Sequence, residues 1–198
     1  MIGKLILKNS LLLALIISLF LIIYKKEKEI ISTHNFKNLK SGDLIFRKEL
    51  NFISNMFALV DNSEYSHIGI VFVEGDQIFV YHIESNEKDN DVKKDEINHF
   101  LSSSEKYVIF RYKDNIDEKS LQNILKNMFQ ENIKFDYYFD LTTTDKLYCT
   151  EFVNNIFYKL INKNIYTYLY DFNGNLVISI KSIMQNKEFI KQTFQRNQ

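Results

Sequence analysis

The sequence Lys146-Leu147-Tyr148-Cys149-Thr150-Glu151-Phe152 contains the chain's single cysteine. Apolar residues then recur at the spacing of an amphipathic helix: Phe152, Val153, Ile156, Phe157 and Leu160. Three threonines and an aspartate at 142–145 lie just upstream, where N-cap side chains are expected. We therefore predict Cys149 in or just before the first helical turn, where free backbone N–H groups and the helix dipole favour a thiolate.

The composition favours one catalytic-sized domain with a short accessory segment. The chain has 198 residues, of which 45% are hydrophobic and 15% aromatic, enough to form a packed core. Lysine plus arginine equals aspartate plus glutamate, 25 against 25, so the basic surface that nucleic-acid binding needs is not expected. A single cysteine excludes an internal disulfide and any zinc site built from several cysteines.

The N-terminal segment is predicted to anchor the chain in a membrane. Residues 11–24 are apolar apart from one serine, and lysines lie before and after them. Extended back over the preceding lysine, the segment approaches the ~20 residues that a spanning helix needs. No small-x-small cleavage site follows, so we favour an uncleaved signal anchor over residues 1–24, with a cleaved signal peptide or a buried soluble helix as alternatives. Residues 25–38 are then a linker and residues 39–198 the main domain.

The main domain mixes β-prone runs with helical patterns and is predicted to be α+β. A turn at Ser41-Gly42-Asp43 leads into a short strand that ends near Arg47. The further elements are strands at 66–73, 78–84 and 106–112, helices at 51–60 and 117–131, an exposed loop at 85–94, segments of uncertain type at 95–101 and 166–179, and a short strand or helix at 183–194.

A tight turn at Gly75-Asp76 would join two strands in a defined register. A two-residue turn with glycine first pairs Gly69 with His82 and His67 with Glu84. Because strand side chains alternate, these four residues project from one face, and Gly69 leaves space in front of them. The other face is predicted to join the core, and its residues are Ile68, Ile70, Phe72, Phe79, Tyr81 and Ile83.

A carboxylate beside an imidazole is the arrangement that a general base needs. Glu84 accepting from one ring nitrogen of His67 would fix the tautomer, and the other nitrogen would reach the Cys149 thiol. His82 is the alternative orienting residue if the register differs. Each residue alone also has a plain structural explanation, since a single cysteine is often a small buried side chain and a glutamate is usually solvated. Their joint position is what indicates a site.

Other polar residues are open to more than one interpretation. His67, His82 and Glu84 could bind zinc together, but a zinc site leaves the position of Cys149 unexplained, so no metal and no cofactor is predicted. Asp43 is expected in a turn or cap. Four further residues either line a pocket or simply pack in the fold: Tyr65, Ser66, Tyr148 and Asp136. His34 and His99 have no partner that the sequence can place.

Five segments occur in an order that matches a known family: Ser-Gly-Asp-Leu-Ile-Phe at 41–46, Ser-His-Ile-Gly-Ile-Val at 66–71, Ile83-Glu84, Phe135-Asp136-Tyr137 and Tyr148-Cys149-Thr150-Glu151. Together they resemble the circularly permuted branch of the NlpC-type, papain-like cysteine hydrolases, specifically the YiiX-like proteins. Lecithin retinol acyltransferase is a distant relative of this branch. The resemblance spans roughly Leu39 to Leu160, most of the main domain.

The resemblance implies a small antiparallel sheet packed on helices, here preceded by the membrane helix. It also implies Cys149 as nucleophile, His67 as general base and Glu84 as the third residue. The Cys149 N–H would form part of an oxyanion hole. Thr150, at a position where a small serine is common, and the charged insert at 85–94 depart from the family.

The leading hypothesis is a membrane-anchored cysteine hydrolase of the amidase or peptidase class in the cell envelope, with its catalytic domain on the extracytoplasmic side. Lysines at both ends of the anchor leave its orientation open. The expected partners are a peptide, amide or acyl-ester substrate, which would form an acyl-enzyme on Cys149, and the membrane. A lipid acyltransferase or thioesterase using the same residues, and a non-catalytic envelope binding module, are the alternatives.

Overall fold

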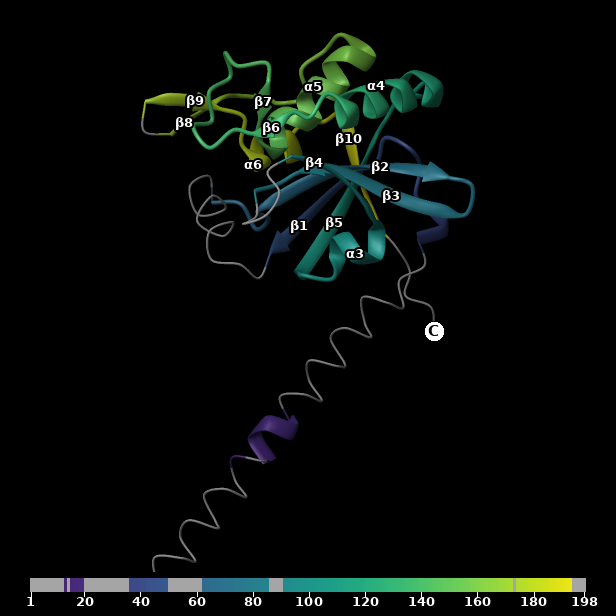
Figure 1. The fold of residues 1–198 in the computed structure, drawn as a ribbon, viewed down its shortest axis with the longest axis vertical. Helices are drawn as coiled ribbons and strands as arrows, with labels where there is room; N and C mark the ends of the chain where they lie inside the picture. The colour runs from purple at the N-terminus through teal and green to yellow at the C-terminus, as the bar shows by residue number, and fades with distance from the viewer. Residues whose placement is uncertain are drawn as a thin grey trace, which may run out of the picture. The chain divides into compact units, whose positions relative to one another are not determined.

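A six-stranded antiparallel sheet forms the centre of the unit Lys37–Thr193 (Figure 1). The computed structural model describes residues 13, 15–19, 36–49, 62–85, 91–172 and 174–193. In sheet order, the strands are β10 (Phe189–Gln192), β5 (Ser104–Tyr112), β1 (Leu44–Glu49), β2 (His67–Glu74), β3 (Gln77–Ile83) and β4 (Val92–Glu96). The α+β class predicted from the sequence is confirmed.

Helices cover both faces of this sheet (Figure 1). α4 (Glu118–Gln130) and α5 (Cys149–Ile161) pack on one face, and α3 (Ile97–Leu101) packs on the other. The shorter elements are η1 (Phe36–Asn38), α6 (Ile180–Met184), the parallel pair β6 (Lys134–Phe135) and β7 (Lys146–Leu147), and the antiparallel pair β8 (Tyr170–Phe172) and β9 (Asn175–Val177).

Alternating side chains divide β1 between the two covering layers. Leu44 and Phe46 belong to the main core, which also contains the apolar stripe of α5. The next residue, Arg47, points to the other side, where it donates to the carbonyl of Phe100 in α3. Both faces are therefore buried near β1 and β2, and a polar side chain on the α3 side is enclosed rather than solvated.

The predicted hairpin register is confirmed near the turn, whereas the predicted pairs of Gly69 with His82 and of His67 with Glu84 are absent from the pairing of β2 with β3. Glu74 pairs with Gln77 across the two-residue turn, and the pairing continues without a shift to Ile70 opposite Tyr81. The predicted core face is confirmed as well: Ile68, Ile70, Phe72, Tyr81 and Ile83 lie in the main core, and Phe79 packs against it.

The space expected in front of Gly69 is filled. A Cβ built on Gly69 would lie only 2.4 Å from Val80 Cγ1 and 3.3 Å from His82 Cβ. The prediction of open space at this position is wrong, because the Val80 side chain occupies it. A side chain at position 69 would therefore require the Val80 side chain to shift.

The prediction of an exposed loop at 85–94 is wrong over its last residues, which form the start of β4. Val92 is buried opposite Ile83, and Lys94 Nζ lies 2.8 Å from Glu74 Oε1. A strand with one buried apolar side chain and charged neighbours does not show the alternation expected of strands. Residues 86–90 and the predicted helix at 51–60 lie outside the described residues.

The helix predicted from Cys149 is confirmed, but the predicted cap at 142–145 is wrong. The N-cap residue of α5 is Tyr148, and β7 separates the threonines from the helix. The carboxyl group of Glu151 accepts from the backbone N–H of Tyr148 at 3.4 Å, so this first turn is capped from within. The strand predicted at 106–112 and the helix at 117–131 are confirmed as β5 and α4.

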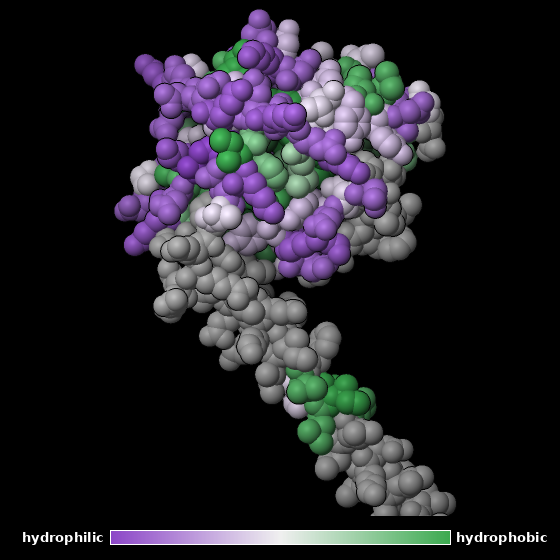
Figure 2. Space-filling view, turned by 180° about the vertical axis from the view of Figure 1, so that it is seen from behind, coloured by the Kyte–Doolittle hydropathy of each residue, from purple (hydrophilic) through white to green (hydrophobic). Residues whose placement is uncertain are grey.

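Most of the predicted membrane segment lies outside the described residues. Leu13 and residues 15–19 are helical, and the apolar side chains among them are 51–60% exposed; they form the green patch in the lower part of Figure 2. Within the described parts of the chain, no helix has both the length and the apolar character needed to cross a bilayer.

Candidate active site

Cys149 is the first residue of α5, and the chain on both sides of it is fixed to one backbone segment. The backbone N–H of Ile178 donates to Tyr148 Oη at 2.8 Å, and Thr150 Oγ1 donates to the carbonyl of Ile178 at 2.6 Å. Tyr148 and Thr150 are both buried, whereas Cys149 between them is only partly buried as a residue and is not in a disulfide. The position of Cys149 at the helix start is therefore held by its neighbours.

The surroundings of Cys149 favour the thiol over the thiolate. Burial of the sulfur raises the pKa of Cys149 to about 12, and the Glu49 carboxylate adds to this rise. The backbone N–H groups of Thr150, Ile68 and Cys149 act in the opposite direction and lower this pKa. The predicted thiolate is thus wrong for this structure, because loss of hydration outweighs the N–H groups at the helix start. α5, which begins at Cys149, packs against β2, the strand that begins at His67.

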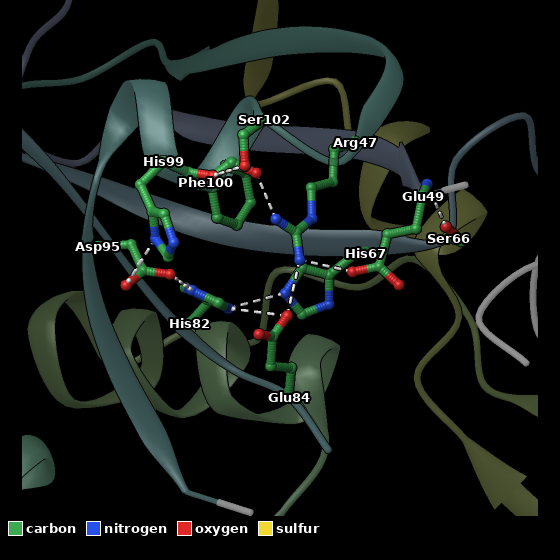
Figure 3. Close-up of polar contacts among 10 residues, drawn as sticks. All are labelled: Arg47, Glu49, Ser66, His67, His82, Glu84, Asp95, His99, Phe100 and Ser102. Carbon is green, nitrogen blue, oxygen red and sulfur yellow. Dashed lines mark hydrogen bonds and ion pairs between the residues drawn. The ribbon is translucent and has the colours of Figure 1, made fainter. Parts of the chain in front are cut away.

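His67 is bonded to His82 rather than to Glu84. His67 Nε2 lies 3.0 Å from His82 Nδ1, and His82 Nε2 lies 3.1 Å from Asp95 Oδ2 (Figure 3). His67 is buried, His82 is fully enclosed, and both rings contact the ring of Phe100 in α3. His82, the alternative orienting residue in the sequence analysis, therefore makes the contact with His67.

The hydrogen-bond chain fixes the tautomers of both histidines. The pKa of Asp95 is lowered, chiefly by its hydrogen bond to His82, so its carboxylate accepts from His82 Nε2–H. His82 Nδ1 then carries a lone pair, and His67 Nε2 must donate to it. The lone pair of His67 is consequently on Nδ1, the nitrogen available to take a proton.

Glu84 is held by Arg47. Arg47 Nη2 lies 2.6 Å from Glu84 Oε2 and 2.5 Å from Glu49 Oε1, while Glu84 Oε2 is 3.8 Å from His82 Nδ1 (Figure 3). The guanidinium also lies 4.2 Å from the centre of the Phe100 ring. Glu84 thus contacts Arg47 and His82 rather than bonding to His67. Its predicted role as the residue that orients His67 stays a prediction.

The Arg47–Glu49 pair connects the two halves of the site. Burial lowers the pKa of His67 well below its usual value, and the positive charge of Arg47 lowers it further. The negative charge of Glu49 raises the pKa of Cys149. Each member of this ion pair therefore favours the neutral form of one of the two groups, Arg47 that of the His67 imidazole and Glu49 that of the Cys149 thiol. Within the described residues, no hydrogen bond joins the Cys149 sulfur to His67.

Several polar residues considered in the sequence analysis have structural roles. Asp43 is buried, accepts from the backbone N–H of Lys40, and binds Arg111 through both oxygens at 2.7 Å, so the expected turn role is confirmed. Asp136 accepts from two backbone N–H groups of its own loop. Ser66 Oγ accepts from the N–H of Glu49.

Tyr65 lies in the main core. His99, which had no partner in the sequence analysis, lies 3.3 Å from Asp95, and His34 is outside the described residues.

Arg47, Glu49 and Asp95 are the site residues that sequence reasoning missed. Arg47 ended a predicted strand but gave no sign of which residue it would face, and it lies opposite His67 in the sheet. Asp95 lay in a segment of uncertain type. A metal could be held by His67, His82 and Glu84, whose nearest ligand atoms all lie within 4.8 Å of one another.

The fold matches that of a solved protein. The crystal structure of metalloprotein YiiX from Escherichia coli O157:H7 superposes with a TM-score of 0.67 at 18% sequence identity, covering 80% of this chain and 98% of that chain. No curated protein matches this chain. The family model described as permuted papain-like amidase enzyme, YaeF/YiiX, C92 family, matches residues 38–189. The chain therefore belongs to the permuted papain-like amidase family, which indicates a cysteine hydrolase.

Proposed function

We propose that this protein hydrolyses an amide bond through a covalent acyl-enzyme on Cys149, with His67 as general base. The observation that carries the proposal is the packing of α5, whose first residue is Cys149, against β2, whose first residue is His67. The shared Arg47–Glu49 pair supports placing both residues in one site.

The proposed reaction begins with a neutral pair. As the Cys149 sulfur attacks the carbonyl carbon, its proton moves to His67 Nδ1, so that thiolate forms only during attack. The N–H of Cys149 donates to the developing oxyanion. The protonated His67 then gives its proton to the leaving amine as the C–N bond breaks, and the acyl group remains on sulfur.

Hydrolysis of the acyl-enzyme completes the cycle. His67 takes a proton from the attacking water, the C–S bond breaks, and Cys149 recovers the proton as the carboxylic acid leaves. We assign the orienting role to His82, since its Nδ1 lies 3.0 Å from His67 Nε2. Glu84, the residue implied by the family resemblance, would contribute through Arg47 and His82.

We further propose that residues 1–24 anchor the protein in a membrane of the cell envelope. The exposed apolar helical side chains at Leu13 and 15–19 support this proposal, as do the lysines that flank the segment. An envelope peptide, such as that of a cell-wall polymer, or a lipid-linked acyl group is then the expected substrate.

A second candidate function, a non-catalytic binding module, is favoured by one observation. The pKa of Cys149 at about 12 leaves little thiolate for spontaneous reaction at neutral pH. The two functions differ in what His67 does, because only the enzyme uses it to activate the thiol.

The test is to incubate the full chain with a panel of peptide amides and a panel of acyl esters, and with thiol-directed acylating probes. The enzyme predicts turnover of one panel and labelling of Cys149 that His67→Ala reduces. His99→Ala is the matched control, since it removes an exposed histidine outside the proposed pair. Turnover retained in Cys149→Ala would exclude this mechanism, and absence of both turnover and His67-dependent labelling would favour the binding module.

A further inference from the structure

Three polar side chains on the α3 side of the sheet converge on one point. His82 Nδ1 lies 3.0 Å from His67 Nε2 and 3.8 Å from Glu84 Oε2, and the nearest ligand atoms of the three residues are within 4.8 Å of one another (Figure 3). Two imidazole nitrogens and a carboxylate oxygen are ligands of zinc, and a tetrahedral zinc site separates such atoms by about 3.3 Å. Small side-chain shifts would bring these atoms to that spacing.

The residues behind the three side chains are arranged as around a metal ligand. Asp95 Oδ2 accepts from His82 Nε2 at 3.1 Å, which leaves the lone pair of His82 on Nδ1, the atom that faces the point of convergence. His82 is completely enclosed, so its ring cannot turn away without losing this bond. Carboxylate–histidine pairs of this kind orient the ring and increase its basicity as a ligand.

One contact opposes a cation at this point. Arg47 Nη2 donates to Glu84 Oε2 at 2.6 Å, and a metal ion would compete with the guanidinium for that oxygen. Arg47 would keep its second partner, Glu49 Oε1, at 2.5 Å. The guanidinium therefore weakens binding without excluding it, which suits reversible occupation.

We infer that His67, His82 and Glu84 form a binding site for a divalent ion of the zinc class, and that its occupation switches off the proposed base. Binding at His67 Nε2 requires the proton on that nitrogen to move to Nδ1. The imidazole then holds an N–H where it needs a lone pair, and it cannot accept the thiol proton of Cys149. The binding site stands on the geometry alone, whereas the inhibitory effect rests on the proposed function.

Direct metal binding tests the site without reference to activity. The full chain carrying Cys149→Ala, which removes the thiol as a possible ligand, is titrated with Co²⁺ and with Zn²⁺ against a chromophoric chelator. The expected result is one equivalent bound, with the visible absorption of a four-coordinate Co²⁺ ion. Adding His82→Ala removes a ligand and should weaken binding by about 100-fold or more, and Asp95→Asn by about 10–100-fold.

Two further variants keep the test decisive. His99→Ala, which changes a histidine that touches Asp95 but is absent from the group, should leave the affinity unchanged. If circular dichroism shows that His82→Ala does not fold, Glu84→Gln serves instead, because Glu84 is partly exposed. Failure to bind one equivalent, or binding that both His82→Ala and Glu84→Gln leave unchanged, would overturn the site.

The inhibitory effect is measured separately in the chain with Cys149 intact. Zn²⁺ should suppress acylation of Cys149, and a chelator should restore it. If no probe acylates Cys149 even with chelator, the proposed function fails while the metal site stands. If acylation proceeds at full rate with the site saturated, the inhibitory part is refuted.

Discussion

His82 is the residue whose replacement best separates the contact seen in the structure from the one implied by family resemblance. Its Nδ1 faces His67 and its Nε2 faces Asp95, so two amide variants can each remove one of the two bonds. His82→Asn places a polar atom near the position of Nδ1 and loses the bond to Asp95. His82→Gln reaches toward Asp95 and loses the bond to His67.

The magnitudes follow from burial. Each variant leaves one partner, the buried His67 or the partly buried Asp95, without its hydrogen bond, which should lower the free energy of unfolding by about 1–3 kcal/mol. His82→Ala loses both bonds and the packing against Phe100, so we expect about 2–4 kcal/mol. The two amide variants should differ instead in the rate of Cys149 acylation, because loss of the residue that orients the base lowers such a rate by about 10²–10⁴-fold.

The assay is the rate of Cys149 acylation, together with urea unfolding of each variant. We expect His82→Gln to react about 10²-fold more slowly than the native chain and His82→Asn to stay within about 10-fold. Equal rates for the two folded variants would refute the orienting role of His82. A larger loss in Glu84→Gln than in His82→Gln would return that role to Glu84.

Three further predictions concern the fold. Gly69→Ala should lower the free energy of unfolding in urea by about 1–3 kcal/mol, because the new Cβ would lie 2.4 Å from Val80 Cγ1. Adding Val80→Ala should recover part of this loss. Full stability of Gly69→Ala would contradict this packing. Burial raises the pKa of Glu151 from 4.5 to about 8, so the folded state keeps a proton that the unfolded chain releases in this range. The free energy of unfolding should therefore fall by up to about 5 kcal/mol between pH 4.5 and 8. Thermal unfolding at several pH values measures this fall, and Glu151→Gln should remove the contribution of Glu151 to it. The same dependence of stability on pH in Glu151→Gln and in the native chain would count against this reasoning. Arg111→Ala leaves the buried Asp43 carboxylate without its ion pair and should cost about 3–5 kcal/mol, a loss below 1 kcal/mol being the contrary result in denaturant unfolding.

The hairpin could be predicted from the sequence because its information is local. A glycine-first turn and two alternating strands fix one register, and the structure has that register as far as Ile70 and Tyr81. The helix at Cys149 was predictable for the same reason, from the spacing of apolar residues that follow it.

The contacts of Glu84 could not be predicted because they depend on a strand far away in the sequence. β1 pairs with β2 across a long connection, and this pairing puts Arg47 opposite His67, where it binds the Glu84 carboxylate. The predicted register near the turn was right. Glu84 nevertheless binds Arg47 of β1, and His67 bonds to His82 instead. Nothing in the local pattern places an arginine there.

The enclosure of the histidines also depends on distant segments. Phe100 in α3 covers both rings, and Asp95 in β4 binds His82, yet the charged residues around β4 show no strand pattern. This enclosure explains why the His67 imidazole is neutral. The Cys149 thiol is neutral because of its own burial, where the sequence alone favoured a thiolate. Helix-start position and burial act in opposite directions on Cys149, and burial has the larger effect.

Trapping of the acyl-enzyme tests the central claim most directly. The native chain is incubated with an activated amide or ester substrate, quenched in acid, and analysed by intact mass and peptide mapping. The account predicts one acyl group per chain, located on Cys149, absent in Cys149→Ala and strongly reduced in His67→Ala. An acyl group on any other residue, or an unchanged adduct in His67→Ala, would contradict it.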